Sequence, residues 1–294
     1  MYKFLTLLTG IILALMIGVN GILTDGYGVL WSSVIIHTVG MIAVFIILKL
    51  KQKSLKIFLK APLILYMGGV IGILTVLFNN YAFSKITITS IGALGLFGQT
   101  ISSLVIDYFG LLGMKKIKFT WTNFITIIFG IGGIVIMLDF NNLASVLAVI
   151  LSILTGLSIV LARILNSKLA EKIGLIEGTF VNFLAGVITT LLLAIIFARD
   201  EMHLLISNAY PWWVYLGGLL GVGIVFLGNV TVPRLSSFDL TILAFVGQVG
   251  ASAVLDISFG TGINSSFYGG LVVAVGIIVS TVIEKYRVDS KNQM

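Results

Sequence analysis

The sequence contains no cysteine and few charged residues, and both shortages narrow the classes of protein to which it can belong. Without cysteine, disulfide frameworks, thiolate chemistry and cysteine-based metal sites are excluded. Histidine is also scarce: His37 and His203 lie far apart in the chain, so a histidine-rich metal site is not expected. Charged residues make up 10% of the chain, whereas a soluble domain carries about 25%. We therefore expect no soluble catalytic domain, no nucleic-acid-binding domain and no cofactor.

Hydrophobic residues, by contrast, make up 59% of the 294 residues, and the mean hydropathy is +1.16. A transmembrane helix needs about 20 apolar residues. Apolar runs of this length occupy residues 4–23, 29–50, 62–83, 86–112, 120–139, 145–165, 174–198, 211–232, 238–260 and 266–284. The runs are continuously apolar, which predicts helices rather than the alternating strands of a barrel. The predicted fold class is an all-α polytopic membrane protein with ten transmembrane helices.

The basic residues between the runs predict the orientation of the chain. Five lysines lie within residues 49–60 and three within 115–118, and alternation of the spans places both groups on one side of the membrane with the two chain ends. Cytoplasmic loops are enriched in Lys and Arg. We therefore expect a multi-pass protein of the cytoplasmic membrane with both termini in the cytoplasm. The same bias explains the net charge of +7 without a polyanionic partner, and Arg163 is expected to reach the membrane interface.

The chain also contains an internal repeat. A shift of 149 residues aligns residues 62–110 with residues 211–259 at 13 of 49 positions, several of them polar. A shift of 146 residues aligns Gly28 with Gly174 nearer the start of each copy. This self-similarity indicates a duplicated unit of five spans.

We expect the first five-helix repeat to comprise residues 1–141 and the second to comprise residues 142–294. Because five is odd, the second repeat must cross the membrane in the opposite sense. The lysines agree: the loops after the second and fourth helices hold eight lysines in the first repeat, and their counterparts hold one basic residue. Inverted repeats are the architecture of alternating-access transporters.

Three motifs carry a family resemblance. They are P-W-W-x-Y-L-G-G-L-L-G at 211–221, V-P-R-L at 232–235 and G-Q-x-x-A-S-x-x-x-D at 247–256, with weaker copies at 61–72 and 98–107. The pattern resembles the YdcZ family of the drug/metabolite transporter superfamily, in a fused two-copy form that covers essentially the whole chain. The resemblance implies ten helices in two interlocked bundles with a central cavity. The first repeat departs from the pattern at Ser84-Lys85, where the second has Pro233-Arg234.

Polar side chains at membrane depth are costly and usually face a cavity or one another. Two sets repeat the spacing i, i+4, i+8, which places each set on one helix face: Gln99, Ser103 and Asp107 in the first repeat, and Gln248, Ser252 and Asp256 in the second. Both glutamines are predicted near the bilayer midplane, where they either line a substrate cavity or bond each other between helices. The aspartates lie about 12 Å farther along their helices, where they are either gating groups or caps of helix ends.

Other candidates have equally plain structural alternatives. Asn80 and Asn229, late in the third and eighth runs, are candidates for substrate contact or for hydrogen bonds to neighbouring backbone. Tyr81 and Phe97 are candidate walls of the cavity. His37 has a side chain that titrates near neutral pH and is a candidate proton carrier, or else a packed helix donor.

These features favour a secondary active transporter that moves a small organic metabolite or drug-like molecule by alternating access, with protons as a candidate coupling ion. The expected partners are the small-molecule substrate and the lipid bilayer, and the single chain is expected to be functional. An uncoupled facilitator or channel-like passage is the alternative. An intramembrane enzyme is less favoured because no nucleophile, base and metal-ligand set converges, and a scaffold would not explain the paired polar faces.

Overall fold

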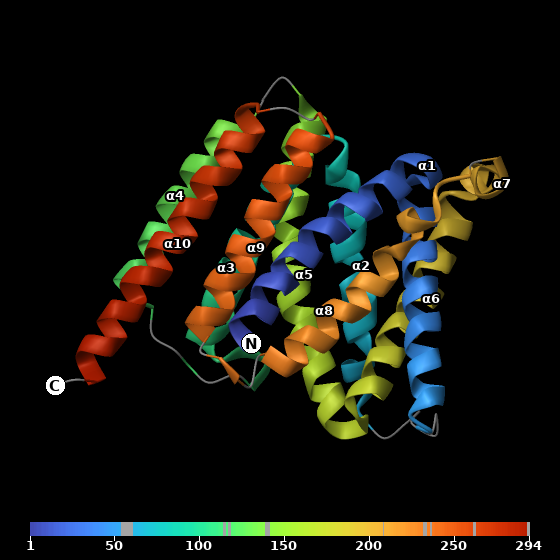
Figure 1. The fold of residues 1–294 in the computed structure, drawn as a ribbon, viewed down its shortest axis with the longest axis horizontal. Helices are drawn as coiled ribbons and strands as arrows, with labels where there is room; N and C mark the ends of the chain where they lie inside the picture. Colours follow the sequence, from blue (N-terminus) through green and yellow to red (C-terminus); the bar gives the residue numbers. More distant parts are fainter. Residues whose placement is uncertain are drawn as a thin grey trace. The chain divides into compact units, whose positions relative to one another are not determined.

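The computed structural model describes residues 1–53, 61–113, 116, 119–138, 142–207, 209–231, 234–235, 237–260 and 263–292, and every regular element among them is helical. The α-helices are α1 (Tyr2–Leu50), α2 (Leu63–Phe83), α3 (Ile88–Phe109), α4 (Trp121–Met137), α5 (Leu143–Ile173), α6 (Leu175–Phe197), α7 (Leu204–Ser207), α8 (Gly217–Thr231), α9 (Ser237–Ser258) and α10 (Ser265–Asn292) (Figure 1). Short 3-10 turns occupy Leu111–Gly113, Arg199–His203 and Trp212–Leu216.

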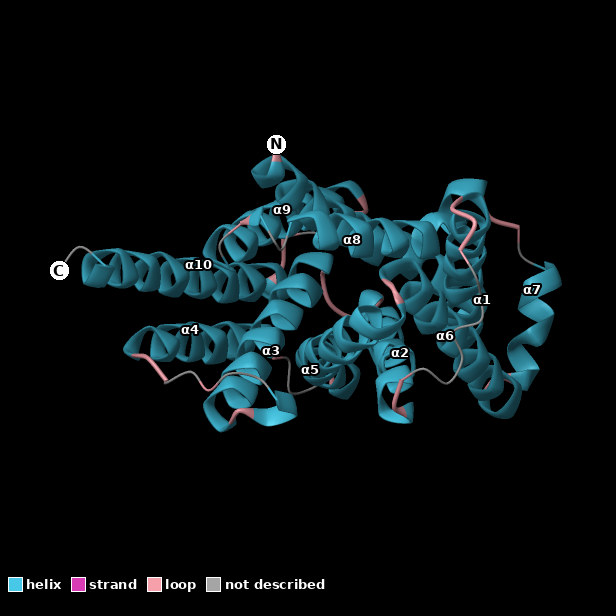
Figure 2. Ribbon diagram, turned by 90° about the horizontal axis from the view of Figure 1, so that it is seen from below, coloured by secondary structure: helices cyan, strands magenta, loops and turns pink. Residues whose placement is uncertain are grey.

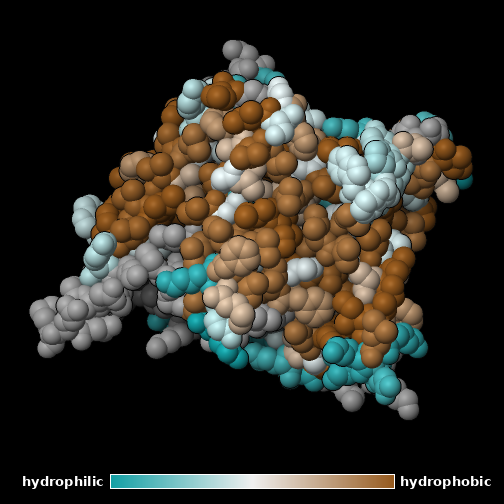
Figure 3. Space-filling view, viewed as in Figure 1, coloured by the Kyte–Doolittle hydropathy of each residue, from teal (hydrophilic) through white to brown (hydrophobic). Residues whose placement is uncertain are grey.

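The helices have the length and the surface of membrane spans. Within the described residues, six are long and apolar enough to cross a bilayer: α1, α2, α3, α5, α6 and the Ser265–Glu284 part of α10. The apolar helical stretches at α4, α8 and α9 are shorter than these six. Hydrophobic residues cover most of the described surface along the helices on the face drawn in Figure 3. The chain is therefore a polytopic membrane protein, whereas ten crossings stay a prediction.

Two glycines with positive φ mark the corners between the first and second helices of the predicted repeats. Gly28 (φ 74°, ψ 167°) interrupts α1 between the runs 4–23 and 29–50. Gly174 (φ 102°, ψ 152°) separates α5 from α6. Only glycine adopts these angles readily. The shift of 146 residues that aligns the two glycines in the sequence thus aligns two corners of the same kind.

The chain divides into two compact units, and each draws on both halves of the sequence. The first unit comprises residues 1–15, 85–156 and 226–294, and the second comprises residues 16–84 and 157–225. Equivalent segments of the two predicted repeats therefore lie mostly in the same unit, whereas α1, α5 and α8 each contribute to both units. The repeats follow sequence similarity and the units follow packing, so the boundary at residue 141 stays a prediction.

In the first unit, α4 and α10 form an antiparallel pair (Figures 1 and 2). Thr122, at the start of α4, donates a hydrogen bond to Glu284 near the end of α10 (2.5 Å). Met137, the last residue of α4, lies against Gly269 near the start of α10. These two helices are the fifth helices of the two predicted repeats.

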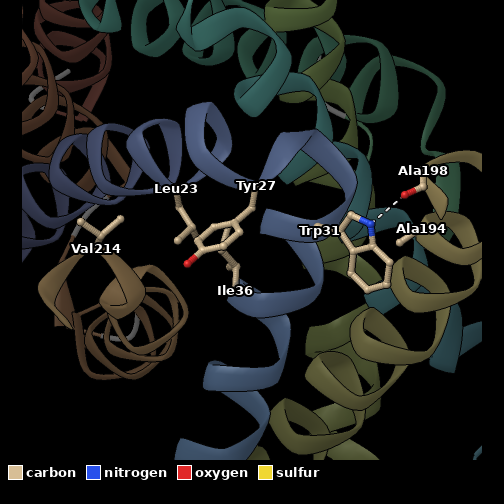
Figure 4. Packing of buried hydrophobic residues seen from close by; sticks show 7 residues of the cluster. All are labelled: Leu23, Tyr27, Trp31, Ile36, Ala194, Ala198 and Val214. Atoms are coloured by element: carbon tan, nitrogen blue, oxygen red, sulfur yellow. Dashed lines mark hydrogen bonds between the residues drawn. The ribbon is translucent and has the colours of Figure 1, made fainter. Parts of the chain in front are cut away.

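In the second unit, the part of α1 beyond Gly28 pairs with α6, again antiparallel. Trp31 Nε1 donates to the carbonyl of Ala198 just after α6 (2.8 Å), whereas Phe45 lies against Phe180 near the start of α6, with ring centroids 6.1 Å apart and the rings tilted by 41°. Around the tryptophan end lies a hydrophobic core whose side chains are shown in Figure 4. It contains Leu23, Tyr27, Trp31, Ile36, Ala194, Ala198 and Val214. The pair consists of the second helices of the two predicted repeats.

Candidate functional site

The polar face of α9 packs against the first turns of α3. Gln248 (7% exposed), Ser252 (0%) and Asp256 (0%) are all buried. A Cβ at Gly92 of α3 would lie 3.0 Å from Nε2 of Gln248, so the amide fills the space that this glycine leaves. The hydroxyl of Ser252 is buried and has no hydrogen-bond partner among the described residues. The face predicted to line a cavity is thus closed against a neighbouring helix in this structure.

Asp256 caps the N-terminus of α3. Its two carboxylate oxygens accept hydrogen bonds from the backbone N–H groups of Ile88 (2.8 Å) and Thr89 (2.9 Å). The first N–H groups of a helix have no partner within it, and the helix dipole favours a negative charge there. The side chain of Thr87 accepts a third hydrogen bond from the N–H of Ser90, and completes the cap. The sequence analysis left two roles open for Asp256, a gating group or a cap of a helix end. In this structure Asp256 is a helix cap.

The equivalent face of α3 is more open. Gln99, Ser103 and Asp107 are each partly exposed. Among the described residues, no hydrogen bond from a backbone N–H to the Asp107 carboxylate is recorded. Gly92 precedes Gln99 by seven residues, so Gln248 meets α3 about 10 Å from Gln99 along the helix. Equivalent residues of the two repeats thus have unequal surroundings.

Matched glycines position the backbone of both glutamines, and the sequence interpretation missed them. A Cβ at Gly10 of α1 would overlap the carbonyl of Ala244 and crowd the N–H of Gln248. A Cβ at Gly156 of α5 would overlap the carbonyl of Gly95 and the N–H of Gln99. The shift of 146 residues relates the two glycines and the shift of 149 relates their partners. Extending the alignment with a shift of 146 residues to Gly10 would have revealed the pair Gly10 and Gly156.

A second matched contact lies in the other unit. Asn20 places its Oδ1 against Gly217, and Asn166 places its Oδ1 against Gly68, where any Cβ would overlap these oxygens. Both oxygens are buried and have no hydrogen-bond partner within the part of the chain that the structure describes, which fits weak contacts from the glycine Cα–H groups. The amide of Asn166 also donates to Asn182 (2.8 Å).

Asn80 and His37 belong to a buried network beside the corner of α1. Asn80 (3% exposed) directs its Nδ2 to the hydroxyls of Ser32 (3.2 Å) and Ser33 (3.4 Å), and the Ser32 hydroxyl also bonds Thr24 (3.0 Å). His37 (6% exposed) bonds the carbonyl of Ser33 through Nδ1 (2.8 Å). These contacts hold the two segments of α1 and the end of α2 together.

The remaining candidates are placed differently. Phe97 (7% exposed) lies with its ring against Gly130 of α4, so it is a packing residue in this structure. Tyr81 is partly exposed on α2. Asn229 falls in α8, but its side chain lies outside the described residues.

Comparison with known proteins now identifies the family. Residues 1–136 and, separately, residues 147–283 match the family described as "Putative inner membrane exporter, YdcZ". No curated protein matches the chain. A solved structure described only as "Crystal structure of protein" is similar in fold, with a TM-score of 0.56 at 15% identity over 96% of each chain. Because two consecutive segments match one family over nearly the whole sequence, the chain belongs to the YdcZ family of membrane proteins in a two-copy form.

Proposed function

We propose that this protein is a secondary transporter that exports a small organic molecule through the cytoplasmic membrane by alternating access of two inverted repeats. The family description supports export. The observation that carries the mechanism is the paired contact of Gly10 with α9 and of Gly156 with α3. In each pair, the first helix of one repeat crosses the fourth helix of the other, as a two-fold axis in the membrane plane requires.

Antiparallel packing of equivalent helices supports the inversion. The pairs α4 with α10, α3 with α9, and the second segment of α1 with α6 each join one helix from each repeat, and each runs antiparallel. A parallel duplication would give equivalent helices the same direction. Ten crossings with both termini in the cytoplasm follow from the inversion and the lysine-rich loops.

The two aspartates would be alternating caps. In this structure Asp256 holds the N-terminus of α3 and closes the α3–α9 contact. In the opposite state, Asp107 would cap the start of α9, while Asp256 would be released. The orientation above places Asp256 toward the outside, so the structure would correspond to a state closed to the exterior.

Gln99 and Gln248 are the proposed substrate contacts, with Ser103, Ser252, Asn80, Asn229, Tyr81 and Phe97 as further candidates. Substrate entry would require Gln248 to leave Gly92. Protons are the proposed coupling ion, with Asp107, Asp256 and His37 as candidate carriers. An uncoupled facilitator is the second candidate, since the α3 face is partly exposed while the α9 face is closed.

Charge movement across solid-supported membranes bearing the purified protein tests the proposal. We expect saturable currents with one class among small amines, organic acids, sugars, nucleobases and amino acids, with and without a pH gradient. Gln99→Ala and Gln248→Ala should abolish them, and Gln52→Ala, which removes an exposed glutamine after α1, should not. Uptake of radiolabelled compounds covers electroneutral exchange. Absence of transport by either method would refute the proposed function, and transport unaffected by either site variant would refute the glutamine site.

A further inference from the structure

Two aromatic rings lie in the contact between the second segment of α1 and α6. The ring of His37 covers Gly186 of α6, where a Cβ would overlap it, and the ring of Phe183 covers Gly40 of α1 in the same way. The ring centroids are 6.2 Å apart, and the rings are tilted by 57°. A shift of 146 residues aligns His37 with Phe183 and Gly40 with Gly186, so the two contacts are equivalent. Packing therefore requires a ring at position 37, but not a histidine.

His37 lies beside a buried polar network whose equivalent in the second repeat is apolar. Thr24 shares a hydrogen bond with Ser32 (3.0 Å), and Ser32 accepts another from Asn80 (3.2 Å). The same shift replaces three of these polar side chains by apolar residues: Ala170, Gly178 and Phe183 stand in place of Thr24, Ser32 and His37. A Cβ at the glycine of this second set would meet only the alanine. Because buried polar groups cost free energy and an apolar version of this packing exists in the same unit, the polar set indicates a role beyond packing.

One ring nitrogen of His37 can accept a proton. Nδ1 lies 2.8 Å from the carbonyl oxygen of Ser33. A carbonyl oxygen only accepts hydrogen bonds, so Nδ1 carries the hydrogen of the neutral ring and Nε2 is its basic nitrogen. Nε2 is among the ring atoms nearest to Gly186. Proton uptake at Nε2 would therefore place an imidazolium against the backbone of α6.

Among the described residues, no charged or other titratable side chain forms a hydrogen bond or an ion pair with this ring. The sequences of α2 and α8 contain no charged residue. The one acidic residue of α6, Glu177, precedes Gly186 by nine residues, about 13 Å along the helix, and pairs with Lys53 (3.7 Å). Asp25 of α1 lies twelve residues before His37, on the other side of the Gly28 corner. An imidazolium without a counter-charge is costly inside a membrane, so protonation of His37 and closure of this contact oppose each other.

We propose that His37 is the binding site of the coupling proton, and that proton uptake opens the contact between α1 and α6. The inference rests on the proposed transport function and deepens it by naming the ion and its carrier. A proton from water adds to Nε2, while the Nδ1 bond to the Ser33 carbonyl persists, because both nitrogens of an imidazolium donate. Water in the opened contact solvates the charge. When the proton returns to water, the neutral ring covers Gly186 again, so proton binding shifts the balance between the two states.

Histidine NMR tests the proton site directly, because the chain has two histidines. The full chain is isotope-labelled at histidine and phenylalanine and placed in lipid bilayers. The control variant His203→Gln removes the exposed histidine and leaves the signal of His37 alone. At about pH 8 we expect a neutral ring with its hydrogen on Nδ1 and magnetisation transfer to Phe183. On lowering to about pH 5, the ring should gain its second N–H and lose this transfer.

The variant His37→Phe tests the coupling. It introduces the side chain that already packs on glycine in the equivalent contact, so the melting temperature should be unchanged or higher. Proton movement is followed with the pH dye pyranine inside liposomes, while the small amines, organic acids, sugars, nucleobases and amino acids of the transport screen are added outside. The wild type should move protons with one of these classes. His37→Phe should reduce this proton movement at least tenfold, and His203→Gln should not change it.

The outcomes separate this inference from the proposed function. A ring that stays neutral down to about pH 5, or that gains a proton while it keeps its contact with Phe183, would overturn the inference. Unchanged proton movement in His37→Phe would also overturn it, and would leave the transporter with another carrier. Protonation with loss of the contact, in a protein that transports none of the compounds, would support the proton site and contradict the transport function. Should His37→Phe fail to fold, the NMR titration of the His203→Gln protein decides the matter.

Discussion

Replacement of Asp256 by alanine should open the contact between α3 and α9. The carboxylate accepts hydrogen bonds from Ile88 and Thr89 at 2.8 and 2.9 Å and is fully buried. Hydrogen bonds to a charged group contribute about 1.5–3 kcal/mol each. The variant leaves two backbone N–H groups unpaired, so the closed contact should lose about 3–6 kcal/mol. Where the competing state releases this carboxylate, even 3 kcal/mol shifts the balance roughly 100-fold toward opening.

Cysteine accessibility measures that shift directly, because the chain has no cysteine of its own. Ser252→Cys is nearly isosteric and places a thiol at a buried position one turn from Asp256. A membrane-impermeant methanethiosulfonate should label it slowly in the otherwise wild-type protein. In the Asp256→Ala background, labelling should become tens of times faster.

The equivalent residue supplies the control. Asp107→Ala should not speed labelling of the same cysteine. If Asp107 caps α9 in the opposite state, this variant should destabilise that state and therefore slow the labelling. A lower melting temperature for Asp256→Ala with unchanged labelling would show that the carboxylate only stabilises the fold. That result would refute its role as an alternating cap.

Three further predictions use thermal unfolding of purified protein. Gly10→Ala and Gly156→Ala should each lower the free energy of unfolding by about 1–3 kcal/mol because the added methyl group meets rigid backbone. The control Gly223→Ala, with open space around it, should be nearly neutral. Equal melting temperatures for all three variants would contradict the close helix crossings. Asn80→Ala should lower the free energy of unfolding by about 1–2 kcal/mol because Ser32 and Ser33 lose its hydrogen bonds. A loss of substrate affinity without a loss of stability would instead indicate that Asn80 contacts the substrate. Trp31→Phe should cost about 1 kcal/mol by removing the indole N–H from its carbonyl acceptor, and an unchanged melting temperature would mean that water replaces this bond.

Much of the fold was predictable because each membrane helix requires a continuous apolar run of about 20 residues, which is visible in the sequence. The apolar runs anticipated the helices, whereas the corners at the aligned glycines Gly28 and Gly174 became visible only in the structure. What the sequence did not reveal was how the helices exchange partners between repeats. Close crossings such as that of Gly10 depend on one missing methyl group, and 33 glycines give no indication of which of them meet a backbone.

The candidate site was predictable as a set of positions but not as a set of surroundings. Spacing placed Gln248, Ser252 and Asp256 on one face, and the structure shows all three buried on α9. Spacing alone gave the identical expectation for the face of α3, which is partly exposed. The two equivalent faces differ in their surroundings because the structure holds one conformational state. A pattern that is the same in both repeats does not indicate which face is buried in that state.

The sharing of each compact unit between both halves of the chain has a consequence for biosynthesis. Helices α3 and α4 belong to a unit that also needs α9 and α10, so they leave the ribosome long before their partners exist. Until Asp256 is synthesised, no carboxylate of this residue is present to accept the hydrogen bonds of the first N–H groups of α3. Early helices must therefore be held in the bilayer by the insertion machinery or by lipid until the last spans arrive.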